Sequence, residues 1–171
     1  MKQIIFLIIS LLITTHVSAA NSVTLTMVSP SPLSDLTAGY SGVKIADITI
    51  TNDRANSRFT LTVSGTATPA GKLQSTSGLS QTGDLLDFDL TLKEGSGGAL
   101  GDTVTNTTPT PLLGTYQSFA TGDLSIVFTV SGPGTHASGK VYELWFRTSA
   151  ATYLLAGDFQ TAFQVSLEDD V

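Results

Sequence analysis

The sequence predicts an all-β protein built as a two-sheet antiparallel sandwich. The chain is rich in Thr, Ser, Gly, Val, Leu and Phe and poor in Glu, Lys and Arg, which is a composition typical of strands and turns. Apolar and polar residues alternate over about seven short segments, as expected of half-buried strands. No segment of about ten residues or more has the periodicity of a helix.

The first element is an N-terminal export signal. A single lysine is followed by an almost uninterrupted apolar run from Ile4 to Ile13 and by the small residues of Val17-Ser18-Ala19-Ala20. This order is typical of a signal peptide that is cleaved after residue 19 or 20, so that residues 1–19 are removed. A membrane anchor needs about 18 or more apolar residues, and Thr14-Thr15-His16 interrupt this run. We therefore expect export, with no membrane-spanning segment after cleavage.

The remaining chain fits one domain, with an N-terminal extension over residues 20–32 and a sandwich over residues 33–171. Without Lys2 it has seven basic and 14 acidic residues, a net charge of −7. This charge argues against nucleic acid and anionic lipid as partners. The chain has no cysteine, which excludes disulfides, zinc–thiolate sites and cysteine nucleophiles.

Alternation predicts three strands in the N-terminal half. The first covers Ser22 to Val28, and the second, Val43 to Thr51, is apolar on both faces at its start, as expected of a central or covered strand. After a loop of turn formers at residues 52–57, Phe59, Leu61 and Val63 alternate with threonines. We expect the second and third strands to form a hairpin.

The middle of the chain predicts one strand between two polar segments. A polar connection extends from residue 65 to 83, and Leu86, Phe88, Leu90 and Leu92 then share one face of a strand. The segment from Glu94 to Pro111 is rich in glycine and threonine and has too few apolar residues to pack by itself. We expect it to be a flexible surface loop.

Three further strands are predicted in the C-terminal half, from Leu124 to Val130, from Tyr142 to Phe146 and from Phe159 to Leu167. The stretch from Tyr116 to Ala120 fits either a short strand or a helical turn. Seven such strands with short polar connections favour a sandwich of immunoglobulin-like type. A β-barrel is the alternative.

No residue pattern indicates an enzyme, a cofactor site or a metal site. His136 is the only histidine after cleavage and lies in a run of turn formers. Asp84, Asp87, Asp89 and Asp102 do not follow the spacing of an EF-hand. Asp87 and Asp89 are two residues apart on a strand, so we expect both to be outward-facing, solubilising acids.

Trp145 is the candidate ligand contact. It is the only tryptophan and shares the outward face of its strand with Glu143 and Arg147. A tryptophan in this position fits a sugar-stacking platform or an interface anchor. Partial burial beneath the second sheet is the other interpretation.

Both ends of the mature chain are candidate free strands. The alternating segment from Asn21 to Val28 is followed by Pro30 and Pro32, which break strand pairing and stiffen a tether. The last alternating strand opens at Ala156-Gly157-Asp158-Phe159 and ends close to the C-terminus.

These features, in this order and together with the Thr51-Asn52-Asp53 turn, resemble the structural subunits of chaperone–usher fimbriae. The similarity is greatest to the cysteine-free class that includes enterobacterial colonisation-factor pilins. The resemblance implies an immunoglobulin-like sandwich that lacks its last strand and is completed by the N-terminal strand of the next subunit, a case of β-augmentation. It also implies a cell-surface location reached through the periplasm. The implied partners are other fimbrial subunits, a periplasmic chaperone, an outer-membrane usher and a host glycan.

The same resemblance assigns roles to two sets of residues. The donated side chains would be Val23, Leu25 and Met27. The acceptor edge, which the chaperone would cover first, would consist of Phe159, Phe163, Val165 and Leu167. The alternative function is a self-contained secreted sandwich that binds a carbohydrate or a host surface. In that case residues 21–28 would pair within their own sheet, and Trp145 or the region of Tyr116 would line a groove.

Overall fold

The structure is a computed structural model of the chain. It describes residues 22–28, 36–51, 58–66, 71–75, 85–97, 102–105, 113–130, 139–150 and 159–170. The predicted signal peptide, the prolines of the N-terminal extension and His136 lie outside the described residues.

Twelve strands and one short 3-10 helix make up the described part of the chain, and all strand pairs are antiparallel. The five-stranded sheet has the order β1 (Ser22–Met27), β2 (Tyr40–Thr51), β10 (Lys140–Thr148), β6 (Asp89–Gly97) and β8 (Gln117–Ser118). The four-stranded sheet has the order β12 (Phe163–Asp170), β3 (Arg58–Gly65), β9 (Leu124–Val130) and β7 (Asp102–Thr105). A small sheet contains β11 (Phe159–Gln160), β4 (Lys72–Ser75) and β5 (Leu85–Asp87), and the helix η1 covers Phe119–Thr121.

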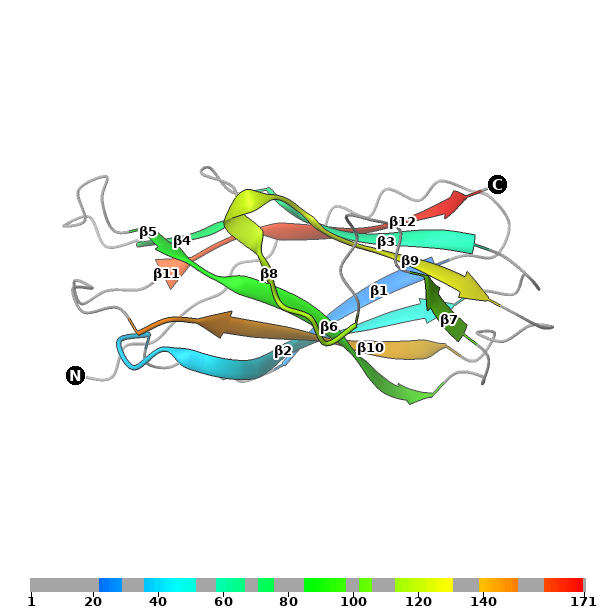
Figure 1. Cartoon of the computed structure of the whole chain (residues 1–171), viewed down its shortest axis with the longest axis horizontal. Helices are drawn as coiled ribbons and strands as arrows, with labels where there is room; N and C mark the ends of the chain where they lie inside the picture. Colours follow the sequence, from blue (N-terminus) through cyan, green and yellow to red (C-terminus); the bar gives the residue numbers. More distant parts are fainter. Residues whose placement is uncertain are drawn as a thin grey trace.

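The two larger sheets form the layers of a sandwich, as predicted. In Figure 1, β2 and β10 lie in the lower layer, β3 and β12 lie in the upper layer, and the small sheet lies at one end. The inward side chains of both layers form one buried core. Aromatic contacts connect the layers, because Phe128 of the four-stranded sheet lies 5.3 Å from Phe59 beside it and 4.7 Å from Tyr142 of the opposite sheet, measured between ring centroids.

The start of β2 is apolar on both faces because the strand contains a β-bulge. Leu144 pairs with Ala46 and Trp145 with Lys44, so Ile45 has no partner on β10. The extra residue shifts the alternation, and Ile45 and Ala46 are both buried, with 3% and 0% of their surface exposed. The predicted central position of this strand is confirmed, since β2 lies between β1 and β10.

The predicted hairpin between the second and third strands is wrong. β2 pairs with β1 and β10 in the five-stranded sheet, whereas β3 pairs with β12 and β9 in the four-stranded sheet. Alternation shows which face of each strand is inward, and both strands do face the core. Alternation does not show which other strand pairs with a given strand. Here the consecutive strands β2 and β3 lie in opposite sheets, on either side of the core.

Two predicted loops contain strands. β4 lies within the polar connection of residues 65–83, and the segment 94–111 contains the end of β6 and all of β7. These strands need few apolar side chains because their backbones pair with a neighbour: Lys140 pairs with Gly97, for example, and Thr103 with Thr129. Backbone pairing is independent of side-chain polarity, so composition underestimated the extent of the sheets.

Two predicted strands are each divided in the structure. The run from Leu86 to Leu92 breaks at Phe88, so that β5 pairs with β4 and β6 pairs with β10. The C-terminal run breaks after Gln160 into β11 and β12. In both cases the inward alternation continues through the break, since Phe88 is 2% exposed and Thr161 is 4% exposed. The ambiguous stretch near Tyr116 contains both predicted forms, β8 followed by η1.

Candidate functional site

The N-terminal strand β1 lies at the edge of the five-stranded sheet and pairs with β2 of its own chain. The register runs without a shift from Ser22 opposite Thr51 to Met27 opposite Ala46. The Val28 amide donates one further hydrogen bond of 2.9 Å to the Ile45 carbonyl. Within the described strands, β2 is the only hydrogen-bonded neighbour of β1.

The side chains of β1 alternate between solvent and core. Thr24 and its two polar neighbours along the strand are exposed, whereas Val23, Leu25 and Met27 are half-buried and pack against the core. Their partners on β2, in the same order, are Ile50, Ile48 and Ala46, all with 0% exposure. β1 therefore covers apolar β2 side chains while remaining partly accessible itself.

The opposite layer also ends in an edge strand beside β1. β12 is the first strand of the four-stranded sheet, and it contacts β1 across the sandwich. Val165 and Leu167 of β12 are only partly buried and pack against the same core. We call the edge of β2 and β12 against which β1 packs the β1 seam (Figure 1). It brings together the predicted donor residues and two of the predicted acceptor residues.

The other two predicted acceptor residues lie elsewhere. Phe159 belongs to β11 of the small sheet, and Phe163 begins β12 opposite Gly65. Each is 1% exposed, so both are already covered within one chain. The part of the predicted acceptor edge that a second molecule can reach is thus the part around Val165 and Leu167.

Trp145 lies on the outer face of the five-stranded sheet and not beneath the second sheet. The Lys93 ammonium lies 3.6 Å from the centroid of its ring, a cation–π contact. The indole Nε1 donates a hydrogen bond of 2.9 Å to Glu143 Oε2, while Lys44 Nζ donates one of 3.1 Å to Glu143 Oε1. Lys44 also forms an ion pair of 2.8 Å with Asp47.

These contacts determine the charge states of the cluster. The hydrogen bond from Trp145, followed by that from Lys44, lowers the pKa of Glu143 below its ordinary value. Hydrogen bonds to Asp47 and Glu143 raise the pKa of Lys44. Both groups are therefore charged at neutral pH, and the indole is held in one orientation by a carboxylate and a lysine.

Tyr116 extends the same outer face toward β8. The Arg147 guanidinium lies 4.3 Å from the Tyr116 ring centroid and donates from Nε to Asp89 Oδ2 at 3.0 Å. Burial raises the pKa of the Tyr116 phenol. Gly42 makes room for this hydroxyl, since a Cβ at that position would lie 2.5 Å from it. The predicted outward face of Asp89 is confirmed, but it is paired with Arg147 and not simply solvated.

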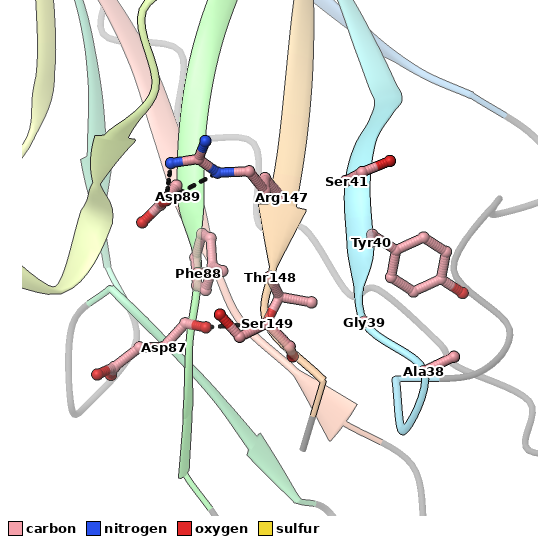
Figure 2. A pocket seen from close by; sticks show the side chains of 10 residues that line it. All are labelled: Ala38, Gly39, Tyr40, Ser41, Asp87, Phe88, Asp89, Arg147, Thr148 and Ser149. Carbon is pink, nitrogen blue, oxygen red and sulfur yellow. Dashed lines mark hydrogen bonds and ion pairs between the residues drawn. The ribbon is translucent and has the colours of Figure 1, made fainter.

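A polar hollow of about 670 Å³ adjoins Arg147 at one end of the five-stranded sheet. Figure 2 shows the Arg147–Asp89 pair on one side of this hollow and the Tyr40 ring on the other. Thr148 Oγ1 donates to the Asp87 carbonyl at 3.0 Å along its floor. The lining residues are Ala38, Gly39, Tyr40, Ser41, Asp87, Phe88, Asp89, Arg147, Thr148 and Ser149.

Sequence reasoning placed Trp145, Glu143 and Arg147 on one outward face and named the region of Tyr116 as an alternative groove, but it missed Lys93 and Lys44. Lys93 and Glu143 have opposite charges and are direct partners on β6 and β10. The sequence shows both charges, but it does not show that the two residues are neighbours, because the order of the strands is not known from it.

Two further findings concern the chemistry of the described residues. Within them, no group of three or more His, Asp or Glu side chains is arranged to hold a metal ion. No helix in the ranges given above is long and apolar enough to cross a membrane.

Comparison of the chain with protein-family models, with curated proteins and with solved structures found no match. The class that the structure defines is an antiparallel all-β sandwich with an N-terminal edge strand.

Proposed function

We propose that the protein is a structural subunit of a surface fimbria, that it polymerises by exchange of its N-terminal strand, and that it contributes to adhesion. The observation that carries this proposal is the position of β1. An alternating strand at the start of the described chain occupies an edge of the sandwich and covers side chains of its core. The resemblance of the chain ends to chaperone–usher pilins supports the same function.

In the proposed assembly, β1 of one subunit pairs with β2 of the next. Val23, Leu25 and Met27 would then contact core side chains of the neighbouring subunit in the register that they have here. Backbone hydrogen bonds provide the affinity in this kind of strand addition, and alternate side chains provide specificity. Because the donated strand and the β1 seam are different surfaces of one subunit, the contact repeats head to tail and gives a filament.

The partners follow from this proposal. The neighbouring subunits supply and receive β1, and a periplasmic chaperone and an outer-membrane usher deliver exported subunits to the cell surface. The outer face around Trp145 lies on the far side of the sheet from the core and remains available for a host glycan. No cofactor, metal or nucleic acid has a part in this function.

A self-contained secreted binding module is the second candidate. One specific observation favours it, since β1 pairs with β2 of the same chain, as such a module would require. Its ligand would be a carbohydrate at the Trp145 face or in the adjoining hollow, whose hydroxyl, carboxylate and aromatic groups suit a polyhydroxylated ligand.

An SDS gel of the purified mature chain, unheated beside heated, separates the two candidates. Interlocked subunits resist SDS at room temperature, so the proposal expects a ladder that collapses on heating. A chain lacking residues 20–29 should give no ladder, and addition of a synthetic peptide of these residues should restore its folding without restoring the ladder. A monomer in every lane at all protein concentrations would favour the binding module.

The matched variants Leu25→Asp and Thr24→Asp refine this test. Both place a carboxylate on β1, one facing the core and one facing solvent. The proposal expects that only Leu25→Asp abolishes the ladder. Equal effects of the two variants would show that net charge, and not the inward face of β1, controls assembly.

A further inference from the structure

The position that strand exchange would fill with a neighbour's strand is already occupied in the single chain. β1 pairs with β2 along its whole length of six residues and contacts β12 of the opposite layer. The same residues that the proposed assembly would donate thus cover the core of their own subunit.

We infer that the free subunit is self-capped: β1 closes the β1 seam of its own chain, and assembly begins when a second copy of this chain exchanges strands with it. This inference rests on the proposed function and adds the partner and the control of assembly. The partner is a second copy because β1 itself occupies the site here, and an identical segment from another molecule makes the same contacts in the same register.

Several features of β1 allow it to leave. It has hydrogen bonds to one neighbouring strand only, its inward side chains are half-buried, and its other side chains are exposed. It also precedes every other described element, so its release breaks no second connection within the described fold. β1 also has an apolar inward face, and each of its inward side chains lies opposite a buried apolar side chain of β2.

The chain before Leu36 has the length needed for exchange. Residues 29–35, which connect Val28 to Leu36, are seven residues that span about 23–25 Å when extended, and β1 adds its own length beyond them. A domain of this size has a radius of gyration of about 15 Å, so the released strand can reach another molecule.

Because β1 is covalently connected to its own domain, we expect the self-capped monomer to dominate in dilute solution. A strand tethered by a short linker is present at an effective concentration in the millimolar range at its own β1 seam. In a filament each β1 makes the contacts that it made in the closed monomer, and only the end subunits have an open seam or a free strand. We therefore expect assembly with a lag that preformed filament ends remove.

A disulfide between β1 and β2 tests the inference in a chain that has no other cysteine. Thr24 and Thr49 are direct partners whose side chains face away from the core, and such pairs suit disulfide geometry. In the variant Thr24→Cys/Thr49→Cys, we expect oxidation of dilute monomer to give a bond within one chain. The oxidised form should add to preformed filament ends at least tenfold more slowly than the reduced form.

The matched control is Thr62→Cys/Ser166→Cys, which joins direct partners on β3 and β12 and leaves β1 free. It should assemble equally well when oxidised and reduced. A second measurement mixes a tagged Thr24→Cys chain with an untagged Thr49→Cys chain before oxidation. A covalent heterodimer is expected only after incubation at a concentration that allows assembly.

The outcomes separate the inference from the proposed function. If the wild type assembles and the oxidised Thr24→Cys/Thr49→Cys variant assembles at the same rate, self-capping is overturned while the fimbrial function stands. Self-capping is also overturned if the dilute Thr24→Cys/Thr49→Cys variant forms no disulfide within one chain. If neither the wild type nor any reduced variant assembles, the proposed function fails, and a bond formed within one chain then assigns β1 permanently to its own sheet.

Discussion

Gly71 provides the sharpest test of how the small sheet and the 3-10 helix are joined. Its φ of +71° lies in the left-handed region, and a Cβ there would lie 2.0 Å from the Phe119 carbonyl oxygen and 2.6 Å from its carbon. Gly114 has a similar φ of +80° but has no atom within 4 Å of the corresponding position. Gly71→Ala and Gly114→Ala therefore share the conformational cost and differ in the steric one.

The magnitudes follow from these two contributions. A left-handed backbone costs an alanine about 1–2 kcal/mol, offset by about 0.4–1 kcal/mol from the stiffer unfolded chain. Gly114→Ala should therefore lower the free energy of unfolding by about 1 kcal/mol. Gly71→Ala adds overpacking of about 1–3 kcal/mol, toward the upper end because the obstacle is backbone, for a total of about 3–4 kcal/mol.

Thermal unfolding followed by circular dichroism measures the difference. At about 2–4 °C per kcal/mol for a domain of this size, Gly114→Ala should lower Tm by a few degrees and Gly71→Ala by roughly 6–16 °C. Equal shifts in the two variants would refute the close approach of Gly71 to η1. In that case the small sheet would not pack on the helix as described.

Three other predictions concern the core and the outer face. Phe128→Ala removes a fully buried ring that contacts two other aromatic rings and should cost about 3–5 kcal/mol in a urea titration; a cost below 1 kcal/mol would contradict its place in the core. Because the pKa of Glu143 is lowered on folding, its contribution to stability is complete above the unfolded pKa of about 4.5 and is lost as the pH falls through the lower folded value. The stability difference between the wild type and Glu143→Gln should therefore shrink on acidification, and a pH-independent difference would refute the charged contact with Trp145. Lys93→Met should shift the fluorescence of Trp145 and cost about 0.5–1 kcal/mol, whereas an unchanged emission spectrum would exclude the cation–π contact.

At the β1 seam, alternation predicted which residues face inward but not which of them are accessible. Alternation identified the inward residues of β1 and of the C-terminal strand, and the structure places Val23, Leu25 and Met27 against the core, as it does Val165 and Leu167. Alternation did not distinguish Phe159 and Phe163, which are fully covered, from the accessible residues of the same run. Exposure depends on what the rest of the chain places over a residue, and the small sheet that contains Phe159 was not predicted.

The outer face of the five-stranded sheet gives a similar comparison. The position of Trp145 on an outward face followed from its spacing from Glu143 and Arg147. The contacts of Trp145 and Glu143 required the order of β2, β10 and β6, because Lys93, which lies over the Trp145 ring, and Lys44, which binds Glu143, come from the strands on either side of β10.

The sequence by itself determined the all-β class of this protein and the inward face of most of its strands. These are local properties, because successive side chains of a strand point to opposite faces whatever the neighbouring strand is. Only the tertiary structure decided that β2 and β3 belong to different sheets, that a bulge at Ile45 shifts the alternation and buries both Ile45 and Ala46, and that β1 pairs with β2 of its own chain. Those features depend on backbone hydrogen bonds between residues far apart in the chain, and such bonds leave almost no trace in side-chain periodicity.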